Sequence, residues 1–205
     1  SSLMDDYANS VLTEGLVTLG TQASGLLSYI GDSDWLQVGL SANTTYMIDV
    51  KGDITSGARL DPIADPMLIV RDAAGDIVYR VDDSNGSLDV QAFFTPSGSG
   101  AYFLEVRSAF KYDIGAYTID VALAPADDHA DLFDATATAL SLGDTTAVQT
   151  SGNLGLPGDK DVFSVTLNEG AVYLLGASGI GGSNGTLRDP YLRVFDDKGA
   201  LLDFN

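Results

Sequence analysis

The stretch GDSDWLQVGL, residues 31–40, combines a turn that carries two aspartates with the alternating apolar pattern of a strand. Leu36 and Val38 recur at every second position, which is the period of a β-strand with one buried face. We expect Asp32 and Asp34 to stand together at the entrance of this strand, on the side opposite the apolar residues. Two carboxylates about 5 Å apart repel each other by roughly 3 kcal/mol at an effective dielectric of about 20, so the turn needs a counter-charge.

The same period of two continues on both sides of this stretch. TYMIDV (45–50) and AYTIDVAL (116–123) each place their large apolar residues on one face. Further strand candidates are MLIVRD, DIVYRV, VQAFF and AYFLEV, which are separated by turn clusters such as DSNGS and PSGSG. About nine short strands of this kind predict an all-β fold, an antiparallel β-sandwich of the jelly-roll type.

The charge of the chain restricts its partners. Its 205 residues include 10 Lys and Arg against 29 Asp and Glu, which gives a net charge of −19. Such a chain repels phosphate backbones and anionic membrane surfaces, and no apolar run is long enough to cross a bilayer, so we expect neither nucleic-acid binding nor membrane insertion. All but three of the acidic residues are aspartates, which suit turns and oxygen-ligand sites. No cysteine is present, which excludes disulfides and thiolate metal sites.

Three segments of the first half return in the second half. The pairs are DDYAN (5–9) with DDHAD (127–131), GDSDWLQV (31–38) with GDKDVFSV (158–165), and DPMLIVRDAAGDIVY (65–79) with DPYLRVFDDKGALLD (189–203). Their offsets drift by only a few residues, as loop-length changes between two copies of one domain would produce. The sequence therefore predicts a complete module at 1–126 and a second copy at 127–205.

The second copy is incomplete at its C-terminal end. It stops at Asn205, before any counterpart of VQAFF, AYFLEV or AYTIDVAL. Without these strands the second sandwich would expose apolar side chains and open strand edges. We expect that the natural chain continues past Asn205; the alternative is that another molecule supplies the strands, by strand exchange or in an oligomer.

Taken in order, five elements resemble the bacterial pre-peptidase C-terminal domain family. They are the acidic opening, GDSDWLQVGLSANTTYMIDV, DPMLIVRDAAGDIVYRVDDSNG, FFTPSGSGAYFLEVRS and GAYTIDVA. The resemblance covers residues 5–123 and the first two-thirds of a second copy. It implies compact β-sandwich modules, secreted or at the bacterial cell surface, that are appended to peptidases, other exported hydrolases and large surface proteins. Such modules are similar to the collagen-binding modules of clostridial collagenases.

The resemblance also implies calcium where the acidic N-terminal segment meets the aspartate-bearing turn. Calcium takes about six to eight oxygen ligands with tolerant geometry, which suits a cluster of carboxylates. The ligands expected in the first copy are Asp5, Asp6, Asn9, Asp32 and Asp34. Those expected in the second copy are Asp127, Asp128, Asp131, Asp159 and Asp161. The simpler interpretation is that these aspartates cap turns and solubilise the surface.

A second acidic group and two aromatic residues are weaker candidates. Asp65, Asp82 and Asp83 could meet at another loop end and bind a metal, although DP and DDSNG are also ordinary turn sequences. Trp35 and Tyr112 could anchor an extracellular protein or polysaccharide ligand. The alternative for Trp35 is that it covers the calcium-binding turn.

Catalytic patterns do not hold together. GGSNG (181–185) has the letters of a nucleophile elbow, but such an elbow follows a strand, opens a helix and needs a later histidine, whereas the one histidine is His129. We therefore predict that this segment is no enzyme.

The sequence favours a calcium-stabilised accessory module of an exported peptidase or other hydrolase that attaches to substrate or matrix. The alternative is a spacer or ligand-binding module of a large surface adhesin.

Overall fold

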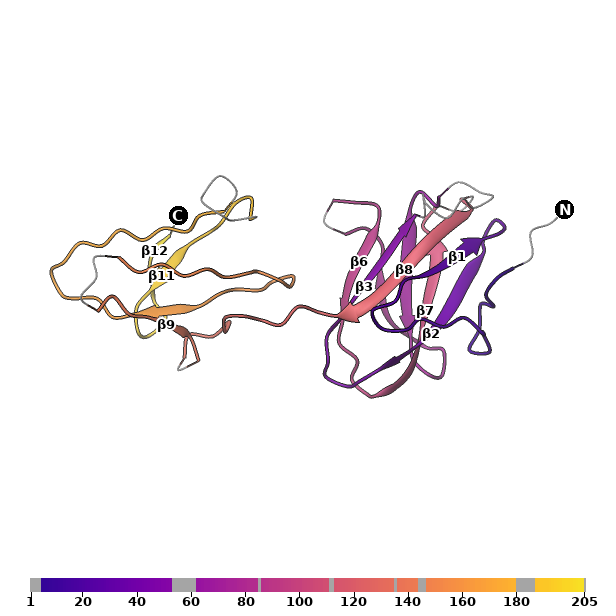
Figure 1. The fold of residues 1–205 in the computed structure, drawn as a ribbon, viewed down its shortest axis with the longest axis horizontal. Helices are drawn as coiled ribbons and strands as arrows, with labels where there is room; N and C mark the ends of the chain where they lie inside the picture. Colours follow the sequence, from indigo (N-terminus) through magenta and orange to yellow (C-terminus); the bar gives the residue numbers. More distant parts are fainter. Residues whose placement is uncertain are drawn as a thin grey trace. The chain divides into compact units, whose positions relative to one another are not determined.

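The computed structural model describes residues 5–52, 62–84, 86–110, 113–134, 136–143, 147–179 and 187–204. The chain divides into two compact units (Figure 1). Unit 1 contains residues 1–126 with 155–157, and unit 2 contains residues 127–154 with 158–205. No helix in the described parts of the chain is long and apolar enough to cross a membrane.

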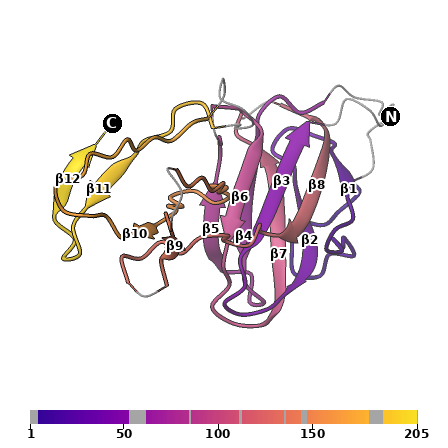
Figure 2. The ribbon, with the colours of Figure 1, turned by 60° about the vertical axis from the view of Figure 1, so that its left-hand side comes forward.

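Unit 1 consists of two four-stranded sheets, and its strands lie side by side in Figure 2. One sheet has the order β1 (Ala23–Leu27), β8 (Gly115–Leu123), β3 (Tyr46–Gly52), β6 (Val90–Phe94). The other has the order β2 (Ser33–Leu40), β7 (Gly100–Ser108), β4 (Pro66–Arg71), β5 (Ile77–Val81). All neighbouring strands in both sheets are antiparallel. The predicted all-β sandwich is confirmed.

The core lies between the two sheets because each contributes the apolar residues of alternate positions. Leu36 and Val38 of β2 are buried, and so are Ile48 and Val50 of β3 in the facing sheet. Burying one such side chain contributes about 1.5–3 kcal/mol. The central strand β4 is buried at five successive positions, so its outer face is covered as well. The alternating sequence pattern thus accounts for the packing of unit 1.

Asp34 lies on the core-facing side of β2, and our expectation of the opposite side is wrong. Residues 34, 36 and 38 differ by two, so a strand must place their side chains on one face. The structure follows this rule, because Asp34, Leu36 and Val38 are each at most 1% exposed while Gln37 between them is exposed. The carboxylate of Asp34 therefore sits at the end of the hydrophobic core.

The described residues of unit 2 form four short strands in two separate pairs. They are β9 (Thr138–Leu140), β10 (Phe163–Val165), β11 (Arg193–Phe195) and β12 (Leu201–Phe204). β10 pairs with β9 in parallel, which departs from the antiparallel pairing that the sequence predicts throughout. The predicted repeat aligns β10 with β2, which in unit 1 pairs with β7 in antiparallel register. β11 and β12 form an antiparallel hairpin.

Most apolar side chains of unit 2 face water. Val172 is 99% and Leu174 is 100% exposed, and Tyr191 and Phe204 are more than 60% exposed. Val162, which is 9% exposed, is the one buried large apolar residue in the described part of unit 2. The free energy gained by burying apolar surface in this unit is therefore small compared with the conformational entropy that is lost on folding.

Amide hydrogen exchange should separate the two units. We expect slow exchange in β2, β3, β4, β7 and β8, and exchange close to that of an unfolded chain in residues 163–179 and 187–204, because local stability follows buried apolar contacts. Hydrogen exchange with mass spectrometry on the 205-residue chain at several concentrations measures this. Equal, concentration-independent protection of both units would contradict the assignment of a minimal core to unit 2.

Candidate metal centre

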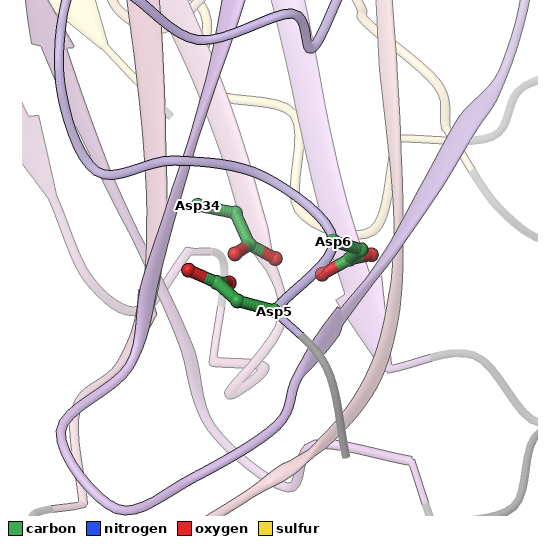
Figure 3. A group of neighbouring side chains, drawn as sticks. All are labelled: Asp5, Asp6 and Asp34. Atoms are coloured by element: carbon green, nitrogen blue, oxygen red, sulfur yellow. The ribbon is translucent and has the colours of Figure 1, made fainter.

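Three carboxylates of unit 1 converge at the entrance of β2. Asp5 and Asp6 come from the segment before β1, and Asp34 is the second residue of β2. Each offers one oxygen, and these oxygens all lie within 4.8 Å of one another. Figure 3 shows the three carboxylates turned toward a common space. The backbone N–H of Leu26 donates a hydrogen bond of 3.0 Å to Asp6, which holds the N-terminal segment against β1.

The carboxylate of Asp34 is completely buried and only partly satisfied. The Tyr117 hydroxyl donates a hydrogen bond of 2.8 Å to its Oδ2 atom, while its Oδ1 atom has no hydrogen-bond partner. Tyr117 reaches this position because its cross-strand neighbour on β1 is Gly25, where an added Cβ would collide with the tyrosine hydroxyl. A buried acceptor without a partner is costly, so the Oδ1 atom marks a place for a ligand.

Asp32 lies beside this group. Asp32 is 4% exposed, and its Oδ2 atom accepts a hydrogen bond of 2.6 Å from the N–H of Ser28. Its Oδ1 atom is buried without a partner, as in Asp34. Asp32 can therefore extend the site. Asn9 is exposed, and its place in the ligand set stays a prediction.

The electrostatics of the cluster disfavour full ionisation in the absence of a cation. Burial, followed by the charge of Asp6 and the weaker effects of Asp32 and Asp5, raises the pKa of Asp34 to about 8, although the Tyr117 hydrogen bond opposes the shift. Burial is also the largest cause that raises the pKa of Asp6 and that of Asp32. The ion pairs found among the described residues involve other carboxylates. The negative charge here is thus left for protons or a cation to neutralise.

Five carboxylates of unit 2 form a comparable group. Asp127 lies within 4.8 Å of Asp128 and Asp161 in one set, and within 4.8 Å of Asp131 and Asp159 in another. Burial, and next the charge of Asp128, raises the pKa of Asp161, whose Oδ1 atom is buried without a partner. The structure thus brings together all five residues that the sequence pairs with the first cluster.

Backbone contacts position this second cluster. The N–H of Lys160 donates to Asp131 at 2.8 Å, and the N–H of Asn153 donates to Asp128 at 3.2 Å. An added Cβ at Gly152 would collide with the carboxylate of Asp161, so a larger residue here would displace that carboxylate. The sequence analysis missed this role of Gly152, and no local motif indicates it.

His129 is held in hydrogen bonds on both sides of its ring. Its Nδ1 atom lies 2.8 Å from the Thr138 hydroxyl, and its Nε2 atom donates to the Ser151 carbonyl at 2.9 Å. The ring also makes an edge contact with Phe163, with 4.6 Å between centroids. These contacts give His129 a structural role next to the acidic group.

Trp35 lies on the other face of β2 from Asp34, so it does not cover that carboxylate. The guanidinium of Arg71 lies over its ring at 4.4 Å from the centroid, and Phe103 packs against it at 6.0 Å. Arg71 is itself fixed by a hydrogen bond of 2.7 Å to Glu105. One face of the indole is therefore occupied within the chain. Tyr112, the other aromatic candidate, lies outside the described residues.

Asp65, Asp82 and Asp83 also meet in the structure, with one oxygen of each within 4.8 Å of the others.

The sequence analysis missed Tyr117 as a partner of the first cluster, because its place in an alternating apolar run marks it as a core residue. The signal that could have found it is chemical, since a tyrosine hydroxyl at a buried position needs a hydrogen-bond partner.

Comparisons with known proteins give structural similarities at low identity. No protein-family profile matches the chain, and no curated protein sequence does. The pre-peptidase C-terminal domain of a collagenase from Bacillus anthracis is 19% identical, with a TM-score of 0.39, over 52% of this chain and 92% of that one. PliG, a periplasmic inhibitor of g-type lysozyme from Aeromonas hydrophila, is 12% identical, with a TM-score of 0.35, over 52% and 94%. These sequence identities and TM-scores are too low to transfer a function to this chain.

The raised pKa of Asp34 predicts that the cation-free protein loses stability as the pH rises. Between pH of about 4 and about 8 the folded state keeps a proton that the unfolded state releases, so the unfolding free energy falls by up to about 1.4 kcal/mol per pH unit. Below pH of about 4 both states are protonated and this dependence ends. Denaturant titrations with a chelator at several pH values measure the slope. Asp34→Asn should flatten it, and a stability that rises over this pH range would contradict the prediction.

Proposed function

We propose that this chain is a calcium-stabilised, non-catalytic accessory module of an exported protein, which attaches its parent to substrate or matrix. The observation that carries the calcium proposal is the buried, unpartnered Oδ1 atom of Asp34 beside the carboxylates of Asp5 and Asp6. An ion bound by these residues would connect the N-terminal segment with β2 and so close one end of the sandwich. Calcium would contribute to folding here, because the site joins segments that are separate in the unfolded chain.

The donor set favours calcium over other ions. The three converging ligands, Asp5, Asp6 and Asp34, offer carboxylate oxygens, which hard cations prefer and which do not attract soft metals. Two oxygens on opposite sides of one calcium ion lie about 4.8 Å apart, given bonds of about 2.4 Å. The spacing of at most 4.8 Å in the cluster is compatible with this distance. Magnesium is a poorer match, because it has shorter bonds and usually keeps several of its waters.

Two observations support the accessory role. The ordered sequence elements resemble those of pre-peptidase C-terminal domains, which accompany exported enzymes. In addition, the one histidine of the chain has both ring nitrogens in hydrogen bonds, which makes it a poor general base. We therefore assign catalysis to another part of the parent protein.

Equivalent local contacts support the proposal that the two units are copies of one module. The Tyr46 hydroxyl accepts a hydrogen bond from the N–H of Ser41, and the Tyr173 hydroxyl accepts one from the N–H of Asn168. The Oδ1 atom of the hairpin residue Asp72 accepts two backbone hydrogen bonds. The Oδ1 atom of Asp196, its counterpart in unit 2, also accepts two. This repetition also favours the second candidate function, a spacer in a large surface adhesin.

Calcium should raise the melting temperature of unit 1. If the dissociation constant is about a hundredfold below the calcium concentration, binding adds roughly 2.7 kcal/mol to the unfolding free energy. Trp35 is the only tryptophan and belongs to unit 1, so its fluorescence reports the melting of this unit separately. A melting curve that does not change between calcium and chelator would rule out the site.

The effect of Asp34→Asn on the unfolding free energy should change sign when calcium is added. Without calcium at pH of about 8 the amide relieves like-charge repulsion and still accepts the Tyr117 hydrogen bond, so the variant should equal or exceed the wild type in stability. With calcium it should be less stable, because a ligand is lost. Asp76→Asn is the matched control, since Asp76 is exposed and belongs to none of the acidic groups. The control should keep the wild-type calcium response, and an equal loss of response in both variants would point to a general charge effect.

An array of matrix proteins and polysaccharides tests the attachment role. We expect calcium-dependent binding of the full chain to at least one target, because the ion fixes the N-terminal segment on the sandwich. Asp76→Asn should bind like the wild type, and Asp34→Asn should lose the calcium dependence. Absence of binding to every target would favour the spacer over the attachment module.

A further inference from the structure

A second group of carboxylates lies at one end of the β4–β5 hairpin. Asp65 directly precedes β4, and Asp82 and Asp83 directly follow β5. Leu68 of β4 pairs with Val81 of β5 in antiparallel register, so the start of one strand and the end of the other share an edge of the sheet. One oxygen of each of the three aspartates lies within 4.8 Å of the others.

Two of these carboxylates have buried oxygens without partners. Asp65 is 6% exposed, and its Oδ1 atom makes no hydrogen bond. The Oδ1 atom of Asp82 is also buried without a partner. Among the described residues, no ion pair involves Asp65, Asp82 or Asp83. Simple turn capping does not account for this, because a capping carboxylate would direct its oxygens at backbone N–H groups.

The surrounding backbone holds Asp65 in place. Its carbonyl accepts a hydrogen bond of 2.9 Å from the N–H of Ala109, which follows β7. Asp113 accepts one of 3.0 Å from the N–H of Ala64. Burial, followed by the charges of Asp82, Asp83 and Asp113, raises the pKa of Asp65. The cluster is thus a positioned and negatively charged site.

We propose that Asp65, Asp82 and Asp83 bind a divalent cation with the ligand preferences of calcium, at a site separate from that of Asp34. The oxygens again lie close enough to share one ion with bonds of about 2.4 Å. β7 lies between β2 and β4, so strand spacing alone separates the backbones of β2 and β4 by about 10 Å. Leu68 of β4 is level with Asp34, and Asp65 lies three residues further along, so one ion cannot serve both sites. The new site would fix the connection that leaves β5, at the same end of the sheet as Asp34.

Hydrogen exchange on the full chain, with calcium chloride or with chelator, tests this site. At calcium about tenfold above the dissociation constant, peptides that cover residues 62–66 and 82–84 should exchange about tenfold more slowly than with chelator. Asp34→Asn should keep this response, and the double variant Asp82→Asn plus Asp83→Asn should lose it. Calorimetric titration should give one calcium ion fewer per chain for the double variant than for the wild type and for Asp76→Asn.

Each outcome is decisive. Unchanged exchange at 62–66 and 82–84 in the wild type would overturn the proposal, even if the double variant failed to fold. A double variant that keeps the wild-type calcium response would also overturn the proposal. Loss of the response in Asp34→Asn would overturn it too, because it would show that the two groups share a single site. A response at 82–84 with none at residues 5–6 and 32–34 would support this site while contradicting the calcium site of the proposed function.

Discussion

The buried carboxylate of Asp34 is the constraint on which the acidic end of unit 1 depends. It continues the core-facing row of β2, where a charge is expensive unless it is paired or neutralised. Tyr117 supplies one hydrogen bond and can do so only because Gly25 leaves room for its ring. Asp6, which an amide of β1 holds close by, adds charge that only a proton or a cation can balance.

The antiparallel topology explains why the acidic residues gather at one end of the sheet. β2 begins, β7 ends, β4 begins and β5 ends on the same side, so residues just outside these strands become neighbours. Asp65 and Asp82 occupy such positions, and Asp34 is the second residue of β2 at the same end. With 29 acidic against 10 basic residues, the chain has few positive side chains to place among them. This shortage of positive side chains is the reason that we propose cations from solution as the counter-charge.

Unit 2 also gathers aspartates, but its described residues form no comparable core. Backbone N–H groups hold Asp128 and Asp131, whereas Val172 and Leu174 lie in solvent. Where little apolar surface is buried, an ion that joined distant segments would account for a larger share of the folding free energy. Under the calcium proposal, unit 2 would therefore depend on the ion more than unit 1 does.

The sequence by itself determined the fold class, because the period of two and the turn clusters are local properties of the chain. It also indicated which aspartates would meet, since repeated acidic segments recur at nearly constant offsets and Asp65, Asp82 and Asp83 flank strands. Only the tertiary structure decided which face of β2 carries Asp34 and that Tyr117 is its hydrogen-bond partner. It also paired Arg71 with Trp35 and placed β10 beside β9. These facts depend on contacts between residues far apart in the chain, and a local pattern does not encode the burial and the missing hydrogen-bond partners that such contacts create.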